Sequence, residues 1–166
     1  GDVTGARTVL EEAFSANPEN EDIWLAAFKL EFENEELERA SLLLKNARNR
    51  EGGDKTNSAR VWMKSAVCAR QMNDAEEERE VLKKGRALHP NFWKLWIMSG
   101  QLEEREKKYA EARKIYDLGL KKCPDSSPMW IAKARLDVLE KKFGLAAKSR
   151  LQELLGETAI LKTQVN

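Results

Sequence analysis

The sequence is poor in the residues that mark metal sites, disulfide frameworks and membrane spans. Its 166 residues include two cysteines, one histidine and four prolines. Cys68 and Cys123 lie far apart and in no metal-ligand spacing, which predicts free thiols in a reducing compartment. The longest apolar run, residues 23–28, is too short to cross a bilayer. We therefore expect neither a disulfide scaffold nor a membrane protein.

Neither sign of charge is in excess. Lysine and arginine total 29 against 28 for aspartate and glutamate, a formal net charge of +1. Because general nucleic-acid binding is usually driven by a large basic excess, this balance argues against it, although a local basic patch stays compatible with it. The N-terminus does not resemble a signal peptide. We expect a protein of the cytosol or nucleus.

What the sequence does contain is a repeat with a period in the mid-thirties. Trp24, Trp62, Trp96 and Trp130 lie 38, 34 and 34 residues apart. One aromatic marker per unit at this period is typical of stacked helical pairs. Small residues follow three of these tryptophans by sixteen positions, at Ala40, Ala112 and Ala146, and large ones follow by twenty, at Leu44, Leu82 and Tyr116. Small contact residues around a large one predict two closely packed antiparallel helices.

The period predicts an all-α, right-handed superhelical solenoid of about four and a half antiparallel helix pairs over residues 1–157. Pro90 and Pro124 each end a unit. The glycine-rich residues 51–57 are a surface loop that accounts for the longer first interval. Because the first half unit has only the second helix of a pair, we expect an excised segment of a longer array. The predicted units are 3–18 (half), 20–57, 58–91, 92–125 and 126–157, followed by a tail at 158–166.

The fourth unit keeps the pattern only if its second helix is shifted by one residue. Its positions twenty and twenty-three after Trp130 hold Arg150 and Glu153, which do not fit, whereas a shift by one residue gives Ala147, Leu151 and Leu154. A turn that is one residue longer is the simplest explanation.

The glutamates of the repeat do not indicate an enzyme. Glu31 and Glu103 recur at one repeat position, which favours a structural hydrogen bond or ion pair to an arginine such as Arg113. His89 directly precedes the helix-ending Pro90 and has no candidate nucleophile or acid nearby in sequence. The sequence has no phosphate-binding glycine loop, metal-ligand cluster or nucleophile motif. We therefore predict no catalysis, no cofactor and no small-molecule substrate.

The residue seven positions after each tryptophan distinguishes two related repeat families. Tetratricopeptide repeats usually have tyrosine there, whereas this chain has Glu31, Ala69, Glu103 and Asp137. An acid at this place, with the Ala-Arg opening seen at residues 112–113, resembles the HAT (half-a-tetratricopeptide) repeat of RNA-processing proteins. The second unit departs from this pattern, and Gly100 is typical of the tetratricopeptide repeat. HAT is the favoured interpretation and the tetratricopeptide repeat the alternative.

Three longer strings carry a closer resemblance. Residues 17–31, 59–65 and 112–124 resemble the pre-mRNA-processing factor 6 family of HAT-repeat splicing factors, and the similarity extends over about residues 3–150. The resemblance implies a nuclear scaffold that bridges the two halves of the spliceosomal tri-snRNP. Its partners would be splicing proteins, with RNA associated indirectly. Two alternatives stay open, an RNA-binding helical-repeat protein and a tetratricopeptide-like adaptor for peptides.

Some residues outside the repeat pattern are candidate partner contacts. Four tryptophans at a fixed repeat position are expected in the core, whereas Trp93 lies outside the period and is a candidate contact. A basic stretch near the end of the chain could contact a partner or RNA, or be only a solvated face. Its residues are Lys141, Lys142, Lys148 and Arg150.

Overall fold

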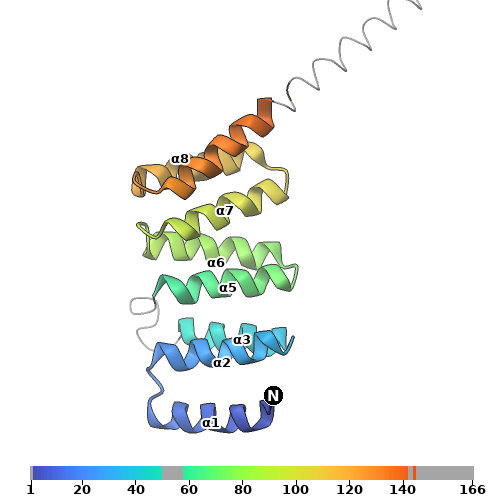
Figure 1. Cartoon of the computed structure of the whole chain (residues 1–166), viewed down its shortest axis with the longest axis vertical. Coiled ribbons are helices and arrows are strands. Elements are labelled where there is room, and N and C mark those ends of the chain that lie inside the picture. Colours follow the sequence, from blue (N-terminus) through green and yellow to red (C-terminus); the bar gives the residue numbers. More distant parts are fainter. Residues whose placement is uncertain (1, 50–57, 142–143, 145–166) are drawn as a thin grey trace, which may run out of the picture.

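The computed structural model of the chain is a stack of α-helices (Figure 1). It describes residues 2–49, 58–141 and 144, and none of these is in a strand. None of the helices in this part of the chain is long and apolar enough to cross a bilayer. The helices are α1 (Val3–Ala16), α2 (Glu21–Glu33), α3 (Leu37–Asn49), α5 (Ala59–Gln71), α6 (Ala75–Leu88), α7 (Trp93–Arg105) and α8 (Tyr109–Lys122), and a further helix at residues 127–141.

Successive helices run back and forth and stack along the long axis of the molecule (Figure 1). Each packs on its neighbours in sequence, and α5 also contacts α7. We call α2, α5, α7 and the helix at 127–141 the A helices, and α1, α3, α6 and α8 the B helices. This arrangement is the predicted all-α solenoid of antiparallel helix pairs.

The observed helices fall inside the units that the period defines. Helices α2 and α3 lie in unit 20–57, α5 and α6 in unit 58–91, and α7 and α8 in unit 92–125. The predicted loop at 51–57, the second helix of the last unit and the tail at 158–166 lie outside the described residues. Asp2 caps α1 by accepting a hydrogen bond from the backbone N–H of Gly5 (2.8 Å).

The turn inside each complete pair has the same geometry. Glu35, Asn73 and Lys107, each eleven residues after its tryptophan, have φ values of 61°, 58° and 59°. The next backbone N–H bonds back to the carbonyl five residues earlier, as in Lys108 to Glu103 (2.8 Å), which closes the A helix. In the fourth unit Lys141 occupies this position and is still helical. The backbone of Lys141 is therefore not in the left-handed conformation of its three counterparts, and the predicted one-residue shift falls on residues outside the described part of the chain.

Close contact between the helices requires the small residues. Ala40 and Ala112 are completely buried, as is the large Tyr116. A Cβ added to Gly119 would lie 2.8 Å from Cβ of Trp96, and one added to Gly100 would lie 2.2 Å from a ring carbon of Tyr116. Neither position can hold a side chain without separating the helices.

The proline that follows a B helix also anchors the next tryptophan. Each of three indole N–H groups donates to the carbonyl oxygen of the proline six residues earlier: Trp24 to Pro18 (2.9 Å), Trp96 to Pro90 (2.8 Å) and Trp130 to Pro124 (2.9 Å). For Trp62 the corresponding residue lies in the segment 50–57. This bond ties the turn between units to the A helix that follows.

The tryptophans differ in burial. Trp62 and Trp96 are buried, and Trp24 is partly buried with its ring edge-on to Phe14 at 4.7 Å. Trp130 departs from the expected core position, because 54% of it is exposed. The repeat would place the second helix of the fourth unit against it, and that helix lies outside the described residues.

The burial of Trp96 leads to a stability prediction. We expect Trp96→Ala to lower the free energy of unfolding by about 3–5 kcal/mol, because it empties a packed site and leaves the Pro90 carbonyl without its donor. Trp93→Ala should cost clearly less, since Trp93 is only partly buried. Urea unfolding of both variants measures the difference. Equal losses would show that the repeat register is wrong.

Candidate protein-interaction surface

A repeated ion pair joins three of the four described B helices, α1, α6 and α8, to the A helix that follows. Three arginines bind an acid 24 residues further along the chain: Arg7 binds Glu31 (2.6 Å), Arg79 binds Glu103 (2.8 Å) and Arg113 binds Asp137 (2.8 Å). Glu31 and Glu103 are buried, and both are held by a guanidinium. They are structural acids, as the repeat suggested, but the partner of Glu103 is Arg79 and Arg113 serves the next unit.

The environment of Glu31 favours its charged form. Arg7 donates from Nε to Oε1 (2.8 Å) and from Nη2 to Oε2 (2.6 Å), a bidentate arrangement. These hydrogen bonds hold the pKa of Glu31 below its usual value, against the opposing effect of burial. The ionised carboxylate therefore stabilises the contact between α1 and α2.

The junction between α3 and α5 lacks both members of this pair. Its two positions are Ser41 and Ala69, so neither an arginine nor an acid is left unpaired. A different contact joins α2 to the start of α5, where Glu21 accepts hydrogen bonds from the backbone N–H (2.8 Å) and from the hydroxyl group (2.5 Å) of Ser58.

Two further acids, Glu78 and Glu104, form ion pairs with arginines of the A helices. Glu78 is 1% exposed and binds Arg70 (2.8 Å) and Arg105 (2.5 Å), which lie on α5 and α7. Glu104 binds Arg135 (2.9 Å) and accepts a hydrogen bond from the hydroxyl group of Tyr116 (2.5 Å). Burial and this bond raise the pKa of Tyr116 above its usual value. The side chains of these arginines are 37%, 42% and 53% exposed. They form a row of cations that are ion-paired but still partly accessible to solvent.

The exposed sides of the A helices line up as one surface. Asp22 and Arg60, each two residues before its tryptophan, form an ion pair between α2 and α5 (3.3 Å). Arg135 reaches from the helix at 127–141 to Glu104 on α7. The residue directly after each tryptophan shares this side of the helix. These residues form an apolar row in which Leu25 is buried, Met63 and Ile97 are partly buried and Ile131 is 69% exposed, so the row is open to a partner mainly at Ile131.

We call this surface the A face. Its apolar row is flanked by charged residues, which is the chemistry that binds an extended peptide or an amphipathic helix. The exposed Val138 lies seven residues after Ile131 on the same side of the helix and extends the row. The sequence did not indicate the arginine row, although the spacing of 24 residues between Arg79 and Glu103 was a readable signal of the interhelical pairs.

The described residues contain no group of three or more His, Cys, Asp and Glu that could hold a metal ion. Cys68 and Cys123 are free thiols, and burial raises the pKa of both. Both are therefore poor nucleophiles at neutral pH.

The candidate contacts from the sequence have different positions. Trp93 is partly buried and borders an open cavity of about 440 Å³ with Lys122 and Pro124. Lys141 is exposed. Lys142, Lys148 and Arg150 lie outside the described residues. The role of all of them as partner contacts stays a prediction.

Comparison with known proteins agrees with this fold. Models of the tetratricopeptide repeat match residues 1–66 and 93–136, which together make up more than half of the chain. The chain belongs to the tetratricopeptide-repeat family. Over 59 residues it is 54% identical to Protein STABILIZED1 of Arabidopsis thaliana, a match that covers 36% of this chain and 5% of that protein. The chain thus spans a small part of this relative.

Solved tetratricopeptide-type structures superpose well. MamA has a TM-score of 0.66 at 16% identity, with 89% of this chain and 84% of that chain covered. PilF of Pseudomonas aeruginosa has a TM-score of 0.61 at 20% identity, covering 86% and 64%. The second TPR domain of human RPAP3, solved with an HSP70 peptide, has a TM-score of 0.53 at 15% identity, covering 66% and 88%. At these identities the likeness shows the fold.

The interhelical pairs allow a test by substitution. We expect Arg79→Ala to lower the free energy of unfolding by about 1–3 kcal/mol, because it leaves the buried Glu103 carboxylate without its guanidinium. Arg60→Ala is the control and should cost less than about 1 kcal/mol, since both members of its pair are more than half exposed. Chemical denaturation compares the two. Similar losses would mean that the buried pair is not a structural element.

The lowered pKa of Glu31 predicts a dependence on pH. A carboxyl group whose pKa is lower in the folded state stabilises the protein above its unfolded pKa of about 4.3, and this stabilisation is lost as pH falls through the folded value. Glu31→Gln should therefore be less stable than the unmodified protein at pH 7, and this difference should shrink as the pH falls below about 4.3 toward about pH 3. Urea titrations at both pH values measure the two differences. A difference that does not change with pH would contradict the assigned role.

Proposed function

We propose that this chain is a HAT-type scaffold of pre-mRNA splicing that bridges protein components of the tri-snRNP in the nucleus. Its fold is that of a tetratricopeptide-like protein-interaction scaffold. The splicing part of the proposal rests on the resemblance of residues 17–31, 59–65 and 112–124 to the pre-mRNA-processing factor 6 family, which is a sequence interpretation. The repeated acid seven residues after the tryptophan, as at Glu31 and Glu103, supports the HAT class.

The A face suggests how such a scaffold binds. A partner segment lies along successive A helices, where the apolar row takes its hydrophobic side chains and the arginines take its acids. Because each helix adds only a few contacts, affinity is spread over several units. Two partners bound to different units would then be held together by the rigid stack.

A peptide-binding adaptor is the second candidate. The row of Arg70, Arg105 and Arg135 favours an acidic ligand, and the human RPAP3 domain of similar fold was solved with the HSP70 peptide SGPTIEEVD. A protein of this kind would collect chaperones instead of splicing proteins. The two candidates use the same A face and differ in the partner.

Affinity capture from a nuclear extract tests the proposal. We expect the unmodified chain to enrich splicing proteins of the tri-snRNP, and Ile131→Glu to lose them, because it puts a charge into the apolar row. Leu118→Glu is the matched control, since Leu118 is 51% exposed on the B helix α8. Enrichment of chaperones would favour the adaptor. Retention of RNA that weakens steeply with added salt would favour direct RNA binding.

A further inference from the structure

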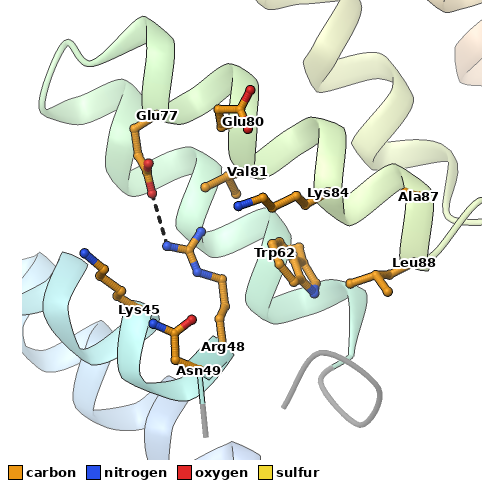
Figure 2. Close-up of a pocket in the computed structure, with 10 residues that line it drawn as sticks. All are labelled: Lys45, Arg48, Asn49, Trp62, Glu77, Glu80, Val81, Lys84, Ala87 and Leu88. Atoms are coloured by element: carbon orange, nitrogen blue, oxygen red, sulfur yellow. Dashed lines mark hydrogen bonds and ion pairs between the residues drawn. The ribbon is translucent and has the colours of Figure 1, made fainter. Parts of the chain in front are cut away.

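The B helices form a second kind of groove, outside the A face. Between α3 and α6 lies a pocket of about 560 Å³ whose floor includes Trp62 of α5 (Figure 2). A smaller cavity of about 210 Å³ occupies the same place one unit earlier, between α1 and α3. Six lining positions are equivalent in the repeat, which makes the two grooves directly comparable.

The larger groove carries cations where the smaller one does not. Lys45, Arg48 and Lys84 correspond to Glu11, Phe14 and Asn46 of the smaller groove, counted from the tryptophan of each unit. One unit later Lys83 and Arg86 are the equivalents of Lys45 and Arg48, whereas the equivalent of Lys84 is Leu118. Lys84 is therefore the cation that neither neighbouring unit has at its position. Lys45 and Lys84 are exposed and form no ion pair with any described residue.

Arg48 crosses the pocket between a ring and a carboxylate. Its guanidinium carbon lies 5.5 Å from the centre of the Trp62 ring, and its Nη2 is 3.1 Å from Oε1 of Glu77. Figure 2 shows Lys84 extending into the same space from α6. At the other end lie Ala87 and Leu88, of which Leu88 is 42% exposed. Cationic side chains and an exposed apolar side chain therefore line the same pocket.

We propose that this pocket docks a protein segment that presents an acidic side chain next to an apolar one. The carboxylate binds between Lys45, Arg48 and Lys84, and the apolar side chain packs on the exposed Leu88. Glu77 and Glu80 line the same pocket and would repel the successive phosphates of a nucleic acid, whereas a single carboxylate can avoid them. The site lies on the B helices, so it is separate from the A-face binding proposed above and does not depend on it.

Selection from a phage library of random 12-residue peptides on the intact chain supplies the probe. We expect selected peptides to share an acidic residue beside a large apolar one. The best peptide, labelled for fluorescence polarisation, should bind Lys45→Glu/Lys84→Glu at least about tenfold more weakly, because two attractive charges become repulsive. Lys64→Glu/Lys83→Glu makes the same change of charge at exposed lysines outside the pocket and should stay within about twofold.

Other outcomes would overturn the proposal. Peptides without the acidic and apolar pair, or binding that the pocket variant leaves unchanged, would show that the groove is not the site. Loss of binding in Ile131→Glu instead would assign the peptides to the A face. Polyuridylate that binds through Lys45 and Lys84, with no peptide that does, would identify a nucleic-acid site.

Discussion

The tryptophan at the start of each A helix is the contact on which the stack depends. The ring of Trp96 lies where three parts of the fold meet: Gly119 of its own unit, the Pro90 carbonyl of the turn before it, and Arg86 of the preceding B helix, 4.8 Å from the ring centre. Trp62 is likewise packed against Gly85 and covered by Arg48. One side chain thus holds a helix pair together and also attaches it to the previous pair.

The position of the tryptophan between two helix pairs also explains which charged residues are structural. Once the tryptophan sets the distance between a B helix and the following A helix, the residues seventeen after one tryptophan and seven after the next are opposite each other. Arg79 and Glu103 occupy these places, and so do Arg7 and Glu31. At the α3–α5 junction the pair is replaced as a whole, by Ser41 and Ala69. An acid at this position is therefore explained by its partner across the junction, without any catalytic role.

The parts of the fold that depend on spacing could be predicted from the sequence, because a helix turns by a constant angle per residue. The tryptophan period located the helix pairs, and the small residues at Ala40 and Ala112 located their contacts. Contacts made by long side chains could not be predicted in this way. Glu78 stands sixteen residues after Trp62, where the other units have alanine, yet it binds two arginines from different A helices. Trp130 has the right spacing but is 54% exposed, so spacing alone does not determine burial.

The same comparison between units separates binding residues from framework residues. A residue that recurs at its position and is buried, such as Tyr116 or Leu82, is explained by the stack. A charged residue that differs from its counterparts and has no partner in the described part of the chain is not explained by it. Lys84 meets both conditions, in a pocket larger than the equivalent one between α1 and α3. In a protein built from repeats, partner specificity resides in such exceptions, because the repeated residues are already engaged in holding the units together.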